Sequence, residues 1–318
     1  MKRSGWRCWV SDAPATVAEG IRAAAARLTP LFDTARLDAE LLMAHALGAT
    51  RSEVLLRHTR DPEPPAFAAL IERRMRHEPI AYIIGTQEFY GLELFVNKNV
   101  LIPRSDSETL IDAAREAFAD LPPTRLLDLG TGSGALLLAA LSIWPKAEGL
   151  GLDCSIDALI VAIKNAQRHA NTPIAFVGSG PAEMPAHRAD RGFARFIQGD
   201  WTKRGWKAHL GRFDLIISNP PYVETTADIA SQVRDHEPAG ALFAGPDGLD
   251  AYRILIPQLP KLLTTGGVAV LEIGASQADA VTSIASDHGF TCNLRHDLGG
   301  RPRALILRLG LGKAGPSG

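Results

Sequence analysis

The spacing of apolar side chains along this chain changes near residue 100. Before that point, apolar residues recur every three or four positions, which is typical of helices with one buried face. The first such segment, 16–28, places Val17, Ile21 and Leu28 on one face. The same spacing predicts further helices over 33–47, near 52–56 and over 64–76. We therefore expect the N-terminal region to be a small helical bundle.

Two short apolar segments follow this bundle and follow a different pattern. Residues 82–85 read Tyr-Ile-Ile-Gly, and residues 89–96 alternate polar and apolar positions after a glycine at position 91. Alternation with a period of two about a glycine predicts a β-hairpin. We expect this hairpin to join the helical bundle to the rest of the chain.

Beyond residue 104, apolar strands alternate with helices, which predicts a doubly wound, Rossmann-like α/β sheet. The predicted helices cover 106–120, 134–144, 155–169, 248–263 and 277–288. The predicted strands cover 125–129, 149–153, 194–198, 213–218, 268–273 and 303–308. Between 171 and 193, glycines and prolines indicate a long loop. The expected domains are a helical domain over 1–80, a hairpin linker over 81–104, an α/β domain over 105–310 and a flexible tail over 311–318.

A glycine-rich turn follows the strand predicted at 125–129. Glycines at 130, 132 and 134 permit positive φ and close approach of a ligand, while N–H groups at the start of the next helix attract electron-rich atoms. The following strand ends at Asp153, where a carboxylate can accept both hydroxyls of a ribose. These features fit a dinucleotide or another nucleoside cofactor. The alternative for Asp153 is to cap the helix that begins near Ser155.

The tetrapeptide Asn219-Pro220-Pro221-Tyr222 follows another buried strand, at the edge where open α/β sheets bind ligands. The Asn219 side-chain oxygen and the Pro220 carbonyl are two acceptors that can receive both N–H groups of a planar NH2. The prolines fix φ, and Tyr222 adds a flat ring beside the acceptors. This arrangement fits an amide or an amino group on an aromatic base. The alternative is an ordinary turn after a strand.

The composition argues against several classes of protein. The 318 residues are 46% hydrophobic and carry a formal net charge of −1, so no overall basic field attracts nucleic acid. The three cysteines, Cys8, Cys154 and Cys292, are widely spaced and show no metal-ligand pattern. No apolar run reaches the roughly 18 residues that a membrane span needs. We expect a reduced, cytoplasmic protein with no metal and no membrane segment.

Several motifs together resemble the release factor glutamine methyltransferases, a family of class I S-adenosylmethionine-dependent methyltransferases. The glycine turn and the Asn-Pro-Pro-Tyr motif are shared by methyltransferases that act on amide or amino nitrogens. More specific segments are 78–85, 88–92, 100–104, 236–238, 247–253 and 271–274. Ser105 stands where the family usually has a second proline. The resemblance covers about residues 14–308 and implies a seven-stranded methyltransferase sheet.

The resemblance also implies roles for individual residues. It places S-adenosylmethionine, and its product S-adenosylhomocysteine, against Asp128, Gly130, Thr131, Gly132, Ser133, Gly134, Asp153, Asp200, Trp201 and Asn219. Within this set Asp153 would take the ribose hydroxyls, and Asp200 and Trp201 would flank the adenine. The substrate amide would lie against Asn219, Pro220, Pro221 and Tyr222, of which Asn219, Pro220 and Tyr222 would be catalytic.

The implied activity is N5-methylation of the glutamine in the Gly-Gly-Gln motif of class I peptide chain release factors. A ribosomal protein glutamine methyltransferase is the first alternative, and a DNA or RNA amino methyltransferase acting on a flipped base is the second. A nicotinamide-binding protein would leave Asn219–Tyr222 without a role. We expect a monomer that binds release factors through its helical domain and makes no direct contact with nucleic acid.

Overall fold

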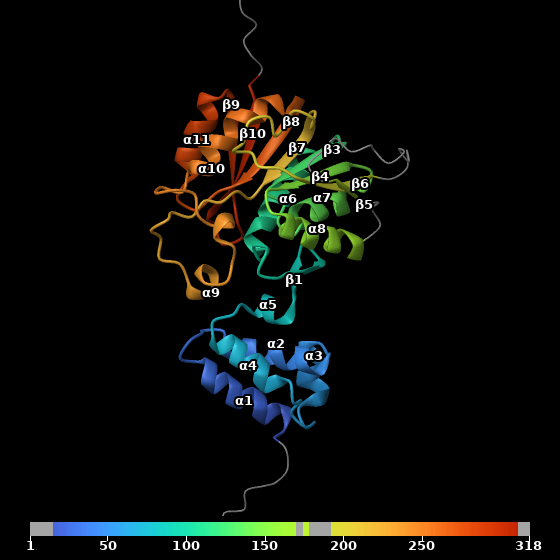
Figure 1. Ribbon diagram of the computed structural model, residues 1–318, viewed down its shortest axis with the longest axis vertical. Helices are drawn as coiled ribbons and strands as arrows, with labels where there is room; N and C mark the ends of the chain where they lie inside the picture. The colour runs from blue at the N-terminus through green and yellow to red at the C-terminus, as the bar shows by residue number, and fades with distance from the viewer. Residues whose placement is uncertain (1–14, 170–173, 178–191, 311–318) are drawn as a thin grey trace, which may run out of the picture. The chain divides into compact units, whose positions relative to one another are not determined.

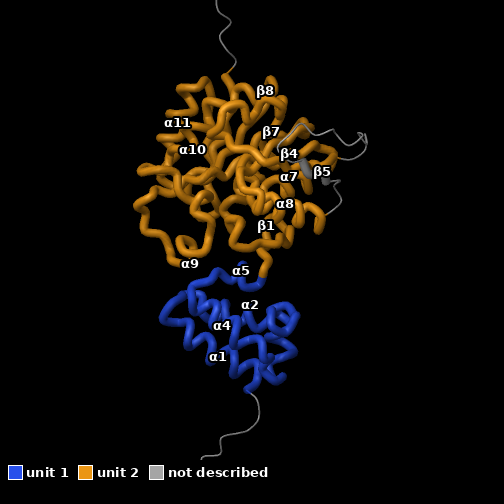
Figure 2. The backbone as a smooth tube through the Cα atoms, in the orientation of Figure 1, with its two compact units in different colours: residues 1–84 blue, residues 85–318 orange. Residues whose placement is uncertain are grey.

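The computed structural model describes residues 15–169, 174–177 and 192–310. The chain separates into two compact units, residues 1–84 and residues 85–318 (Figure 2). The N-terminal segment 1–14 and the predicted tail 311–318 lie outside the described residues. Among those described, no helix is both long enough and apolar enough to cross a membrane.

The first unit is the predicted helical bundle. Its helices are α1 (Val17–Leu28), α2 (Ala35–Leu47), α3 (Arg51–Glu53) with a π-helical turn (Val54–His58), α4 (Phe67–Met75) and α5 (Ile80–Ile84). Thr16 and Glu19 form a capping box at the start of α1, and Gly48 ends α2 with φ of 65°. The apolar faces meet in one core that includes Val17, Ile21, Leu42, Val54 and Ile71.

The β-hairpin lies slightly later in the chain than the sequence predicts. Strands β1 (Thr86–Phe89) and β2 (Leu92–Phe95) pair antiparallel, with Gly91 in the turn at φ of 75°. Residues 82–84, expected in the hairpin, belong instead to helix α5, whose first turn closes when the Tyr82 and Ile83 N–H groups donate to the Pro79 carbonyl. That prediction was wrong because a short apolar run fits a buried helix as well as a strand.

The second unit is built on a mixed sheet of eight strands among the described residues (Figure 1). Its order is β5 (Ile174–Val177), β6 (Phe193–Gln198), β4 (Glu148–Asp153), β3 (Arg125–Leu129), β7 (Phe213–Ser218), β8 (Leu263–Glu272), β10 (Pro302–Leu309) and β9 (Phe290–His296). The first six run parallel, and β10 is antiparallel to both β8 and β9. The predicted doubly wound α/β fold is therefore confirmed.

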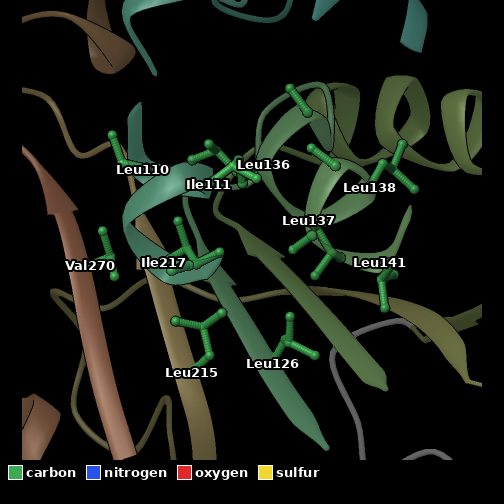
Figure 3. Packing of buried hydrophobic residues seen from close by; sticks show 14 of the residues in the cluster. Leu110, Ile111, Leu126, Leu136, Leu137, Leu138, Leu141, Leu215, Ile217 and Val270 are labelled. Atoms are coloured by element: carbon green, nitrogen blue, oxygen red, sulfur yellow. The ribbon is translucent and has the colours of Figure 1, made fainter. Parts of the chain in front are cut away.

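Helices cover both faces of this sheet. On one face lie α6 (Glu108–Ala117), α7 (Ala135–Ile143) and α8 (Ile156–Arg168), and their apolar side chains pack on Leu126, Leu215, Ile217 and Val270 (Figure 3). On the other face lie α10 (Asp250–Leu255) and α11 (Ala278–Asp287), packed on alternate strand residues such as Leu127 and Ile216. Two buried faces explain why these strands read as continuous apolar runs.

Several elements differ from the sequence prediction. Six strands were placed in the sequence and the resemblance implied seven, whereas the sheet has eight among the described residues. Strand β5 lies at the β6 edge, within the segment predicted as a loop; residues 170–173 and 178–191 of that segment are outside the described residues. Strand β9 and the short helix α9 (Ser231–Arg234) were not predicted, because both are mostly polar. The helix expected over 248–263 ends at Leu255 and continues as a 3-10 helix, because Pro257 and Pro260 cannot donate α-helical hydrogen bonds.

Candidate active site

The carboxyl ends of the central parallel strands meet at one edge of the sheet. The glycine turn follows β3, Asp153 ends β4, Asp200 follows β6 and Asn219 follows β7. A cavity of about 500 Å³ lies at this edge. Its lining includes Gly130, Thr131, Gly132, Ser133, Asp153, Asp200, Trp201, Asn219 and Pro221. The fold thus brings most of the candidate residues to one cavity.

The glycine turn is held by hydrogen bonds from its own backbone. Gly130 and Thr131 N–H groups donate to the Leu152 carbonyl at 2.8 and 3.0 Å, and the Gly132 N–H donates to Asp153 Oδ2 at 2.9 Å. Gly130 and Gly132 have φ of 74° and 54°, a region that residues with a Cβ rarely adopt. The turn therefore follows β3 in a fixed shape with its backbone exposed to the cavity.

Asp128 lies beneath this turn and is not among the residues that line the cavity in the described part of the chain. It is 1% exposed, and its Oδ2 accepts from the Thr131 hydroxyl at 2.6 Å. Burial raises the pKa of Asp128 to about 7, against the opposing effect of the Thr131 hydrogen bond. Asp128 thus supports the glycine turn through Thr131, and its contact with a cofactor stays a prediction.

Asp153 faces the cavity from the end of β4. Besides Gly132, it accepts from the Ser155 N–H, through Oδ1 at 2.9 Å. The cap of α8 is Ser155, whose hydroxyl accepts from the Ala158 N–H at 3.2 Å. Burial raises the pKa of Asp153, whereas its hydrogen bonds from Ser155 and Gly132 act in the opposite direction. The capping role considered for Asp153 therefore belongs to Ser155.

Asp200 and Trp201 also line the cavity. Asp200 accepts from the N–H and the hydroxyl of Thr202, at 2.9 and 2.6 Å, and these hydrogen bonds lower its pKa. A Cβ placed on Gly130 would lie 3.1 Å from the Trp201 ring. The ring and the glycine turn are thus close, and a larger residue at 130 would press on the ring.

The Asn-Pro-Pro-Tyr segment divides between the cavity and the protein interior. Asn219 and Pro221 line the cavity, and Asn219 Nδ2 donates to the Ser107 hydroxyl at 3.4 Å. The Tyr222 hydroxyl donates to Glu272 Oε1 at 3.1 Å, and burial raises the Tyr222 pKa above its usual value. Neither Pro220 nor Tyr222 is among the described residues that line the cavity. Tyr222 is thus directed to a buried carboxylate.

Two buried glutamates near this segment were not singled out from the sequence as site residues. Glu272, at the end of β8, is 1% exposed and accepts from the Ser107 hydroxyl at 2.5 Å. Glu237 accepts from the Ile102 N–H at 3.1 Å and from Arg104. Both glutamates lie in segments that carried the family resemblance. A single buried carboxylate does not change the hydrophobic periodicity of a sequence. Only the resemblance of these two segments to the family could have indicated the two glutamates.

Known proteins with similar sequences show the family of this chain. The chain is 39% identical over 267 residues to a release factor glutamine methyltransferase of Caulobacter vibrioides, covering 82% of this chain and 84% of that protein. The chain belongs to the release factor glutamine methyltransferase family. A second member of the family, from Agrobacterium fabrum, is 37% identical over 286 residues, covering 86% of this chain and 90% of that protein. The family predicted from the motifs is confirmed.

The helical unit matches a known family model, and the chain also resembles a solved structure. Residues 19–85 match the family model described as the PrmC N-terminal domain. A solved release factor-specific protein-(glutamine-N5) methyltransferase from Alicyclobacillus acidocaldarius is 24% identical, with a TM-score of 0.37, and the match covers 66% of this chain and 95% of that one.

Proposed function

We propose that this member of the family transfers a methyl group from S-adenosylmethionine to the side-chain amide nitrogen of a glutamine in a peptide chain release factor. One observation carries the proposal: Asn219 opens into the same cavity as the glycine turn and Asp153. A hydrogen-bonding group for an amide and a binding surface for a nucleoside therefore share one space. The names of the relatives direct the choice of substrate.

The residues present fit S-adenosylmethionine. Gly130 and Gly132 bring backbone without side chains to the lining of the cavity, so a ligand can lie against it. Asp153 offers carboxylate oxygens for ribose hydroxyls, and Asp200 and Trp201 offer an acceptor and a flat ring for an adenine. When bound, this cofactor supplies an electrophilic methyl group on a sulfonium.

Asn219, which lines the cavity, would orient the nitrogen that receives the methyl group, and the Pro220 carbonyl, which is not among the described lining residues, would be the second hydrogen-bond acceptor. An amide nitrogen is a weak nucleophile because its lone pair is delocalised into the carbonyl, so catalysis depends on alignment. Fixed acceptors on its two N–H groups gain strength as positive charge develops on nitrogen during transfer. The nitrogen then loses a proton to Asn219, to the Pro220 carbonyl or to water.

Tyr222 would have a positioning role in this site. Its hydroxyl is engaged by Glu272, and its pKa is raised by burial, so it stays protonated at neutral pH. A phenol in that state does not act as the base. We assign it the role of holding the Asn-Pro-Pro segment in place through its ring and its hydrogen bond.

The finer features of the function belong to the same proposal. The target is the glutamine of the Gly-Gly-Gln motif, the helical unit selects the release factor, and the enzyme acts as a monomer in the cytoplasm. The bundle of α1–α5 has its own core, as expected of a recognition domain that folds as a unit.

The decisive experiment follows methyl incorporation from labelled S-adenosylmethionine. Purified protein is incubated in parallel with a class I release factor, the same factor with the Gly-Gly-Gln glutamine replaced by alanine, ribosomal protein and DNA. We expect label only in the unaltered release factor. Label in ribosomal protein or DNA alone would replace the proposed substrate with one of the alternatives, and equal label in the altered factor would reject the glutamine.

A further inference from the structure

The side chain of Asn219 has two chemically different ends, and the end that faces the cavity decides which groups it can bind. Its oxygen accepts hydrogen bonds, whereas its NH2 group donates them. Rotation by 180° exchanges the two with little change in shape. A site that holds a substrate NH2 group therefore needs something to prevent this rotation.

Glu272 fixes the direction of the hydrogen bonds from the Ser107 and Tyr222 hydroxyls, and Ser107 also lines the cavity beside Asn219. Its carboxylate can only accept, so both hydroxyls that contact it must donate: Ser107 to Oε2 at 2.5 Å and Tyr222 to Oε1 at 3.1 Å. An ionised Glu272 has one accepting oxygen for each of these two hydroxyls. Burial opposes this charge, and the neighbouring Arg303 guanidinium favours it.

Ser107 transmits this direction to Asn219. Its single hydroxyl hydrogen is committed to Glu272, so toward Asn219 it presents a lone pair, which the Nδ2 group meets at 3.4 Å. If the Asn219 amide were rotated by 180°, its Oδ1 would face the Ser107 hydroxyl oxygen, and neither would donate to the other. Turning the Ser107 hydrogen toward Asn219 would relieve that clash but would leave a carboxylate oxygen of Glu272, which is 1% exposed, without this donor.

We propose that Ser107 and Glu272 are positioning residues that hold the Asn219 amide with Oδ1 toward the cavity, so that the site selects a substrate group that donates hydrogen bonds. The inference rests on the proposed function, in which Asn219 binds the substrate amide. We call the hydrogen bonds from Asn219 to Ser107 and from Ser107 to Glu272 the relay. The relay would let the enzyme discriminate glutamine from glutamate, because an Asn219 amide rotated by 180° would present its NH2 donor to the cavity, which suits a carboxylate.

The kinetic test uses release factor as substrate and compares Ser107→Ala with Ser107→Thr. Alanine removes the relay hydroxyl and threonine keeps it, so we expect turnover to fall about tenfold or more in the first and to recover in the second, on the scale of lost transition-state contacts. S-adenosylmethionine affinity should change less than twofold in both. A wild-type turnover in Ser107→Ala would overturn the proposal.

A double-mutant comparison separates positioning from general loss of structure. If Ser107 acts only through Asn219, then Ser107→Ala should have no further effect on turnover in the Asn219→Ala background. Independent, multiplicative losses would contradict the relay. Glu272→Gln should resemble Ser107→Ala, because the new amide can donate to Ser107 and so reverse the direction of its hydrogen bond.

A second readout needs no substrate. In protein labelled with ¹⁵N-asparagine, the Asn219 side-chain NH2 signals are identified by their loss in Asn219→Ala. We expect them to move in Ser107→Ala and Glu272→Gln and to remain near their original positions in Ser107→Thr. Unmoved signals in both of the first two variants would reject the relay. Failure of the wild-type protein to methylate release factor would reject the proposed function alone, and the NMR result would still decide the relay.

Discussion

At the scale of single residues, the proposed function rests most on Asn219. Asn219→Ala removes an acceptor that strengthens as the substrate nitrogen gains charge, so single-turnover methylation should fall roughly 10²–10³-fold, by analogy with loss of one oxyanion-hole donor. S-adenosylmethionine affinity, measured by calorimetry, should stay close to wild type because the glycine turn and Asp153 are intact. A wild-type rate in this variant would mean that the amide-binding residue has been misidentified.

Asn219→Asp serves as the matched control for shape. It keeps an acceptor in the cavity but adds negative charge near the sulfonium, which stabilises the bound ground state as much as the transition state. We expect it to bind S-adenosylmethionine at least as well as wild type and to methylate poorly. Tight binding with full activity would indicate that an acceptor alone is sufficient.

We expect Asp128 to make the free energy of unfolding depend on pH. Its pKa is raised from the usual 3.8 to about 7, so the folded state holds this proton more tightly than the unfolded chain. Its contribution to stability is full below about pH 4 and is lost as pH rises through about 7. Asp128→Asn should therefore weaken the decline in unfolding free energy between pH 5 and 8, measured by urea denaturation.

Asp247→Asn is the control for this measurement. Asp247 is exposed, and its pKa is lowered by its hydrogen bond from Arg253, so its titration lies below that pH range. The slope between pH 5 and 8 should be the same in this control and in wild type. An identical slope in Asp128→Asn would mean that Asp128 is ionised throughout.

At the scale of elements, we propose that strand β3, the glycine turn and helix α7 together bind S-adenosylmethionine. Gly132→Val should abolish S-adenosylmethionine binding, because φ of 54° disfavours a branched residue and the Gly132 N–H is tied to Asp153. Gly289→Val is the matched control: Gly289 also has positive φ, but a Cβ there would meet nothing within 4 Å. Calorimetry should show lost binding only in the first, and intact affinity in a folded Gly132→Val would contradict the assignment.

The same scale shows what the sequence could predict. The glycine turn and Asn219 were found because each is a local motif directly after a strand. Glu272 and Ser107 were not, because they are 165 positions apart and meet only in the folded chain, where the turn before α6 contacts the end of β8. Helix α5 was misread as a strand because its apolar run has no period, and β9 was missed because its residues are mostly polar.

At the scale of the whole molecule, we propose that one unit recognises the release factor and the other carries out methyl transfer. The residues that line the cavity, among those described, all belong to residues 85–318. A protein truncated to 85–318 should therefore bind S-adenosylmethionine but fail to methylate release factor. Circular dichroism would verify that it folds, and calorimetry and label incorporation would measure the two properties. Full activity on release factor would reduce the helical unit to a role in stability.

The order of strands in the sheet also governs how the site comes into existence. β3 is the first strand of this sheet to be synthesised, yet it pairs with β7, and Leu127 meets Ile216 only after roughly 90 further residues. Closing so long a loop costs entropy before any contact repays it, and contacts of this kind slow folding. The glycine turn therefore leaves the ribosome long before Asn219 can join it. A growing chain has no complete cavity until β7 inserts beside β3, and until then it gains no stability from binding the cofactor.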